Sequence, residues 1–201
     1  MSGLDGLLDA KWVHAIRKVE SNGKPNAVRF EPHVYKDRRP DLVLDIPRDT
    51  SDEIATPIRL RAWSTGLIPY TPGRTHDGKP RRASSSKAET DRTAFQHAYQ
   101  LDAAAAVQSS SFGLYQVLGE HLLKLYGTPA LGLQMFSVRP VETSEELLVS
   151  WLHANPAALA AAKRGDVETW VARYNGSKGA KAASYIHDFR AALLEPLGSA
   201  P

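Results

Sequence analysis

The chain has 201 residues, of which 42% are hydrophobic, and a formal net charge of +3, so it has room for one well-filled core and is only weakly basic. It contains no cysteine, which excludes disulfides, thiolate metal sites and a cysteine nucleophile. No run approaches the roughly 18–20 apolar residues that cross a bilayer, and the N-terminus lacks the basic and apolar regions of a secretory signal. We therefore expect a single monomeric domain over residues 1–201, made in the cytoplasm without a leader and not inserted in a membrane.

The first predicted helix covers about residues 7–20. Trp12, Ile16 and Val19 recur at i, i+4 and i+7 and form one apolar stripe along it. Ser-Asn-Gly at 21–23 ends this helix, since Asn and Gly adopt the left-handed backbone conformation that follows a helix C-terminus.

Residues 27–35 alternate apolar and polar side chains and are typical of a loop or a short strand. Over residues 36–92, arginine and aspartate are interleaved and prolines recur at positions 40, 47, 57, 69, 72 and 80. Because proline interrupts helices, we expect no long helix there and interpret the stretch as an irregular Pro/Arg-rich insertion within the same domain. Its basic, serine-rich part, residues 74–87, is expected to be a mobile, solvated loop. Binding to anionic wall polymers or lipid phosphates is the alternative, and nucleic acid is a weaker one.

Helical patterning returns at Thr93 and lasts to the end of the chain. Ala-rich residues 94–108 can be approached closely by another helix, and residues 109–119 form a compact turn segment. The further predicted elements are a helix over 144–155 capped by Ser144, a helix that begins at Pro156, a helix from Asp166 to Tyr174, and a last helix over 180–194 that buries Tyr185, Ile186 and Phe189.

Three short motifs, far apart in the chain, occur in an informative order. They are Val-Glu-Ser-Asn-Gly at 19–23, Ser-Ser-Phe-Gly-Leu-Tyr-Gln-Val at 110–117 and Arg-Tyr-Asn-Gly at 173–176. Separated by helical stretches, they resemble the goose-type lysozyme and lytic transglycosylase superfamily. In that superfamily a Glu ends the first core helix, a Gly-Leu-x-Gln turn follows, and a Tyr-Asn element closes the cleft.

With Phe-Glu-Pro-His-Val-Tyr at 30–35 and the turn at 111–119, the chain is more similar to the phage N-acetylmuramidases found in endolysins. The similarity covers the first 35 residues and nearly all of residues 95–194. It implies a mainly α-helical, lysozyme-like domain that hydrolyses the β-1,4 bond between N-acetylmuramic acid and N-acetylglucosamine in bacterial peptidoglycan. It also implies a lysin that reaches the cell wall from the host cytoplasm through a holin, or that travels in the virion.

Glu20 is the predicted general acid. Cleavage of a glycosidic bond needs a carboxylic acid that is still protonated near neutrality, so its pKa must lie above the usual value of about 4.3. A position at a helix C-terminus, beside Val19 and aromatic rings, disfavours the charged form through the helix dipole and through loss of hydration. The alternative is a solvated glutamate at the end of a helix.

The resemblance places the predicted substrate-binding residues on the other motifs. Ser111 lies in the second motif just before its Gly-Leu-Tyr-Gln turn, Gly113 permits a positive φ or a close approach beside the sugar, and Gln116 presents its amide to an N-acetyl group or to Glu20. Tyr174 is expected to place its ring against Glu20, and Asn175 to bind sugar. Gln116 can equally satisfy turn backbone groups, and Asn175 can equally serve as a helix C-cap.

A second carboxylate is less certain from the sequence. By resemblance Glu31 and His33 lie near the cleft, Glu31 as a catalytic base or oxocarbenium stabiliser and His33 as a substrate contact. Pairing of Glu31 with His33 or with Arg29 is the structural alternative. Asp45 and Asp91 remain further candidates, because the insertion could fold over the cleft.

We expect no metal and no cofactor, since the seven histidines show no ligand spacing, and neither a nucleophile elbow nor a phosphate loop is present. Three alternatives to a muramidase remain. A lytic transglycosylase on the same fold would release 1,6-anhydro products, a non-catalytic virion or wall-binding protein would keep only the fold, and a nucleic-acid-binding protein would show steeply salt-dependent binding. Delivery as a bacterial effector is a further possibility for its route to the wall.

Overall fold

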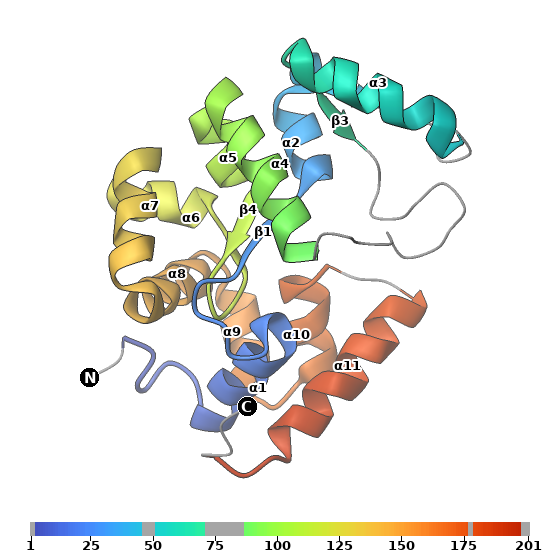
Figure 1. Cartoon of the computed structure of the whole chain (residues 1–201). Helices are drawn as coiled ribbons and strands as arrows, with labels where there is room; N and C mark the ends of the chain where they lie inside the picture. The colour runs from blue at the N-terminus through green and yellow to red at the C-terminus, as the bar shows by residue number, and fades with distance from the viewer. Residues whose placement is uncertain (1–2, 46–50, 71–86, 177–178, 198–201) are drawn as a thin grey trace. The chain divides into compact units, whose positions relative to one another are not determined.

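The computed structural model describes residues 3–45, 51–70, 87–176 and 179–197, and it is mainly helical (Figure 1). The chain folds as two compact units, each built from segments that are separated in the sequence. Unit 1 comprises residues 1–27, 112–117 and 133–201, and unit 2 comprises residues 28–111 and 118–132. The expected mainly α-helical fold class is confirmed.

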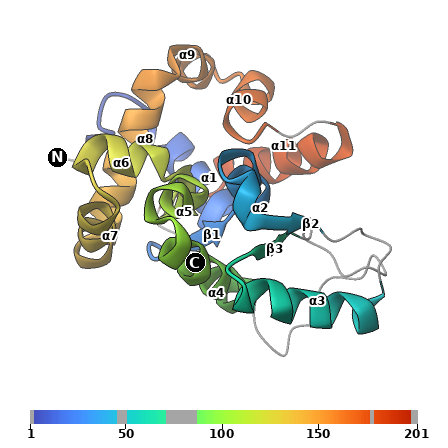
Figure 2. The same cartoon turned by 90° about the horizontal axis from the view of Figure 1, so that it is seen from above.

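Unit 1 holds most of the long helices. They are α1 (Ala10–Ser21), α8 (Pro140–Ala154), α9 (Pro156–Lys163), α10 (Val167–Tyr174) and α11 (Gly179–Leu193), together with the part of α7 (Pro129–Val138) that follows Gly132. Helix α1 lies against α11 in both views (Figures 1 and 2). The core of unit 1 is rich in aromatic rings. The ring centroid of Trp170 lies 5.4 Å from that of Trp12 and 5.7 Å from that of Trp151, and Phe189 also packs on Trp12.

Helix α1 shows why local sequence predicts its ends. Asp9 accepts a hydrogen bond from the N–H of Lys11 at 2.8 Å and caps the start. At the other end Asn22 takes the left-handed conformation at φ 51°, and Gly23 donates back to the carbonyl of Arg17 at 3.2 Å. Trp12 and Ile16 of the predicted stripe are buried. The predicted helix and its stop signal are therefore confirmed, while its start lies at Ala10, three residues after the expected one.

Unit 2 combines short strands with helices. A three-stranded sheet has the order β1 (Val28–Phe30), β4 (Ser110–Phe112), β5 (Val117–Leu118). A parallel pair joins β2 (Val43–Asp45) to β3 (Ile68–Tyr70), with Val43 opposite Ile68. The helices are α2 (Pro32–Arg38), the 3-10 turn η1 (Pro40–Leu42), α3 (Asp52–Ser64), α4 (Lys87–Leu101), α5 (Ala103–Gln108) and α6 (Glu120–Tyr126). Ala98, Ala105 and Ala106 are buried beside Phe30 and Tyr35, and α4 packs against α5.

The insertion is more regular than expected. Helix α3 runs for 13 residues with Pro57 inside it, so the prediction that prolines exclude a long helix there was wrong. Proline removes one backbone hydrogen bond and crowds the preceding turn, a local cost that the remaining bonds of a longer helix can outweigh. The expected mobile stretch lies outside the described residues, apart from Lys87, which begins α4. The side chains of Asp45 and Asp91 also lie outside the described part of the chain.

Three other boundaries differ from the sequence-based expectation. The segment 94–108 is two helices, because Asp102 interrupts it and caps α5 by accepting from the N–H of Ala105 at 2.9 Å. Pro32 opens the unexpected helix α2, a position that suits its fixed φ. Helix α8 begins at Pro140, so the predicted N-cap at Ser144 was wrong. Pro156 and Asp166 do begin α9 and cap α10 as predicted.

Candidate functional site

Glu20 lies in the last turn of α1, in unit 1, and its side chain is half-buried. The hydroxyl of Tyr185, from α11, donates a hydrogen bond to its Oε1. The next residue, Ser21, donates its hydroxyl to the carbonyl of Leu114 at 2.9 Å. The end of α1 is thereby joined both to α11 and to the glutamine turn, residues 113–116, of the second motif.

Gln116 serves the backbone of that turn. Its Nε2 donates to the carbonyls of Gly113 at 3.0 Å and of Ala27 at 3.3 Å. Gln116 itself has φ 50°, a left-handed conformation that is uncommon for a residue with a side chain. The amide nitrogen of Gln116 therefore satisfies backbone carbonyls of the turn, which was the structural alternative to a substrate contact. A contact of its amide oxygen with substrate stays a prediction.

Gly113 has φ 73°, as its place in the turn predicted. A Cβ there would lie 2.0 Å from the hydroxyl oxygen of Ser144 and 2.9 Å from its Cβ. The close neighbour that requires a glycine is thus a side chain of α8. The Ser144 hydroxyl accepts from the N–H of Leu114 at 3.1 Å and donates to the carbonyl of Pro140 at 2.5 Å. The sequence analysis assigned Ser144 only a capping role, because Ser near a helix start is a common capping signal, and it missed this contact with the turn.

The third motif also contacts the turn. The hydroxyl of Tyr174 donates to the carbonyl of Tyr115, and its ring stacks on Trp170 with centroids 4.9 Å apart. Asn175 follows α10 and donates its backbone N–H to Val171 at 3.0 Å, so it does act as a C-cap. The hydroxyl bonded to Glu20 belongs to Tyr185, which the sequence suggested only as a core residue of the last helix.

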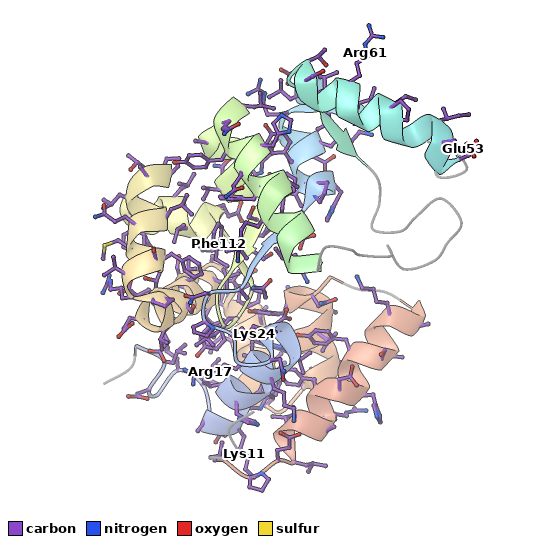
Figure 3. All side chains as sticks on the ribbon, in the orientation of Figure 1. Lys11, Arg17, Lys24, Glu53, Arg61 and Phe112 are labelled. Carbon is purple, nitrogen blue, oxygen red and sulfur yellow. The ribbon has the colours of Figure 1, made fainter. Side chains whose placement is uncertain are left out.

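An ion pair between Arg17 and Glu145 lies next to Tyr115 of the turn. Arg17 of α1, labelled in Figure 3, donates from Nε to the Tyr115 hydroxyl at 2.9 Å and from Nη2 to Glu145 at 3.0 Å. Burial raises the pKa of Tyr115 to about 12, although Arg17 opposes the shift, so its hydroxyl is neutral at physiological pH. Phe112, which is also labelled in Figure 3, packs its ring against that of Phe136 with centroids 5.3 Å apart.

The remaining predicted site residues belong to unit 2. Glu31 precedes α2, and its carboxylate accepts from Nε of Arg29, while its Oε2 lies 3.8 Å from Nδ1 of His33. The side chain of Glu31 is 18% exposed and that of His33 is 60% exposed. Ser111 is buried in β4. Glu31 thus pairs with Arg29, which was the structural alternative to a catalytic role for this carboxylate.

No group of acidic and histidine side chains among the described residues could hold a metal ion. Within the described part of the chain, no helix has both the length and the apolarity needed to cross a membrane.

The N-acetylmuramidase family model matches residues 9–193, which include α1, the glutamine turn and the tyrosine–asparagine motif. The chain belongs to this family. The match supports the expected enzyme class, a glycoside hydrolase of the muramidase type, and peptidoglycan as the substrate of that class.

A solved structure with a similar fold is the crystal structure of the Burkholderia AP3 phage endolysin. The alignment has a TM-score of 0.58 and 19% sequence identity, and it covers 94% of this chain and 66% of that one. The chain therefore spans slightly less than two thirds of the endolysin. No curated protein has a sequence that matches this chain.

Proposed function

We propose that this family member is a peptidoglycan hydrolase that cleaves the β-1,4 bond between N-acetylmuramic acid and N-acetylglucosamine, with Glu20 as the general acid. The observation that carries the proposal is the bond between Glu20 and the Tyr185 hydroxyl at the end of α1, one residue before Ser21 contacts the glutamine turn. Family membership supplies the substrate class.

In the proposed reaction Glu20 gives its proton to the glycosidic oxygen as the bond to the leaving sugar breaks. A negative charge then develops on the carboxylate, and the Tyr185 hydroxyl is already placed to donate to it. A donor aimed at charge that forms in the transition state lowers the barrier without reorganisation. Water then adds through its oxygen to the anomeric carbon of the sugar cation, and its released proton goes to the second carboxylate, which completes the hydrolysis. These steps need acid–base chemistry and water, and we propose no metal or cofactor.

We assign the sugar contacts to Gly113, Gln116, Tyr174 and Asn175, and also to Ser111 and His33. Glu31 is our candidate for the second carboxylate, which would activate water or stabilise the cation. In the structure its carboxylate pairs with Arg29 of the preceding strand. The proposed setting is the bacterial cell wall, reached through a holin or in a virion, with the chain acting as a monomer.

The first prediction tests the acid. We expect the parent to release glycan fragments with reducing N-acetylmuramic acid ends, and Glu20→Gln to lower the rate about a thousandfold, within the range typical of a lost general acid. Zymography and mass spectrometry of the soluble fragments measure both. Glu142→Gln is the control, since it neutralises an exposed glutamate on α8.

Each other outcome removes a different part of the proposal. Fragments lighter by one water would replace hydrolysis with the lytic transglycosylase reaction. A parent that clears no peptidoglycan would support the non-catalytic wall-binding alternative. A fully active Glu20→Gln variant would remove Glu20 from the mechanism.

A further inference from the structure

Ser144 is a fully buried polar residue in the second turn of α8. Its hydroxyl accepts from Leu114 and donates to Pro140, so both of its hydrogen-bonding roles are filled and its orientation is set. A serine that only back-bonds to its own helix needs no partner outside it. The contact with Leu114, which is itself buried, therefore points to a task in the turn.

Besides Gly113, two proposed substrate contacts depend on the turn that Ser144 holds. Gln116 belongs to it, and Tyr174 is bonded through its hydroxyl to the carbonyl of Tyr115. Gly113 lies so close to Ser144 that no other residue fits there. A shift of Ser144 would therefore also displace Gln116 and Tyr174, because the backbone of residues 113–116 connects them.

The next residue of α8 reaches the other half of the site. Glu145 pairs with Arg17, which lies one turn before Glu20 on α1 and also donates to the Tyr115 hydroxyl. Its carboxylate side chain is 18% exposed, which favours a well-defined pair. Two consecutive residues of α8 thus contact the glutamine turn and the helix that carries the proposed acid.

We propose that Ser144 is a positioning residue, which fixes the glutamine turn so that Gln116 and Tyr174 lie in the correct place relative to Glu20. This inference rests on the proposed muramidase function. In this role Ser144 touches neither the substrate nor the reacting atoms, and it acts only through the turn. Glu145 is the second anchor of the same helix.

The experiment compares Ser144→Ala with Thr143→Val. Thr143 is the preceding residue, is equally buried, and donates its hydroxyl to Met135 at 3.2 Å, away from the turn. Each variant removes one buried hydroxyl from α8. At a temperature where both are folded, we expect kcat/KM on solubilised peptidoglycan to fall at least about tenfold in Ser144→Ala and to stay within about twofold in Thr143→Val, since about 1.4 kcal/mol corresponds to tenfold.

A double-mutant cycle separates positioning from general stability. Because Ser144 acts through the turn, Ser144→Ala should cost little further activity in a Gln116→Ala background. Additive losses, or equal activity of Ser144→Ala and Thr143→Val, would overturn the proposal. If Ser144→Ala does not fold, Ser144→Cys keeps a weak acceptor of similar size, and the same comparison with Thr143→Val decides the outcome.

A readout without turnover keeps the two proposals distinguishable. The side-chain amide signals of Gln116 in a ¹⁵N–¹H spectrum should shift in Ser144→Ala and remain in place in Thr143→Val. If the parent releases no glycan, the proposed function fails while the spectrum still tests the positioning. If the parent is active and the Gln116 signals do not move, only the positioning proposal fails.

Discussion

At the scale of single residues, the candidate site depends on hydroxyl groups that helices of unit 1 bring to two places. Tyr185 donates to Glu20, while Ser21, Tyr174 and Ser144 bond to the turn at Leu114 and Tyr115. Each of these groups is a hydroxyl that a conservative substitution removes without deleting a carboxylate or a basic side chain. Conservative substitutions can therefore test them one at a time.

Tyr185→Phe tests the contact with the proposed acid. We expect kcat to fall about 10- to 100-fold, because a hydrogen bond to a developing charge is worth roughly 1.5–3 kcal/mol. The melting temperature should change little, since the ring still stacks on Phe189 at 6.2 Å. Steady-state kinetics on solubilised peptidoglycan measure the effect, and Tyr99→Phe in unit 2 serves as the control. Full activity of Tyr185→Phe would show that the hydroxyl does not assist Glu20.

At the scale of helices, capping residues decide where an element begins when the apolar pattern does not. The alanine-rich stretch after Thr93 has one composition throughout, yet it forms two helices. Asp102 accounts for the break, because its carboxylate accepts from the N–H of Ala105 and also pairs with Arg39. The N–H of Ala105 and, to a smaller extent, Arg39 hold the pKa of Asp102 below its ordinary value.

We expect Asp102→Ala to lower the free energy of unfolding by about 1 kcal/mol, the usual cost of losing an N-cap. A depressed carboxylate pKa stabilises the fold above the ordinary pKa, and this contribution is lost as the pH falls through the folded-state value. The difference between parent and variant should therefore narrow below about pH 4. Urea denaturation at several pH values measures it. Asp102→Asn should retain most of the stability at pH 7, and a loss equal to that of Asp102→Ala would argue against the capping role.

At the scale of the whole chain, unit 2 contains one buried and one half-buried histidine. Burial lowers the pKa of His97 and of His121, and both residues belong to unit 2. When a histidine is harder to protonate in the folded state, the unfolded state binds the proton first as the pH falls below about 6.5. Unit 2 should thus lose stability as the pH falls from about 6.5 to the lowered pKa values of these two histidines in the folded state. In unit 1 hydrogen bonds from Thr169 and Lys18 hold the pKa values of Asp166 and Glu195, respectively, below their ordinary values, and these two contributions are lost near pH 4 and below.

Hydrogen exchange followed by mass spectrometry can test this difference. On going from pH 7 to pH 5.5, after correction for the intrinsic rate, we expect protection to fall in peptides of unit 2 such as α4 and α6 and to remain in α1 and α11. The doubly substituted His97→Gln/His121→Gln variant should remove the pH dependence of unit 2. An equal loss in both units, or no change in that variant, would contradict the assignment to these histidines.

Capping and backbone-conformation rules were sufficient to predict several helix ends and one turn of this protein from its sequence. The stop at Asn22-Gly23, the start at Pro156, the cap at Asp166 and the left-handed Gly113 each depend on backbone geometry within a few residues. The same is true of Glu20 as the end of the first helix. The candidate acid and the glutamine turn could therefore be found from sequence patterns alone.

The tertiary fold alone decided which side chains meet. Tyr185 and Glu20 are 165 positions apart, and Leu114 and Ser144 are 30 apart, so no local pattern signals either contact. The same holds for the membership of each segment in a unit, since the chain passes between the units repeatedly. Short-range sterics and capping act along the backbone, whereas a hydrogen bond across helices exists only after packing has brought distant segments together. The helix ends were thus readable in the sequence, and the partners of the site residues were not.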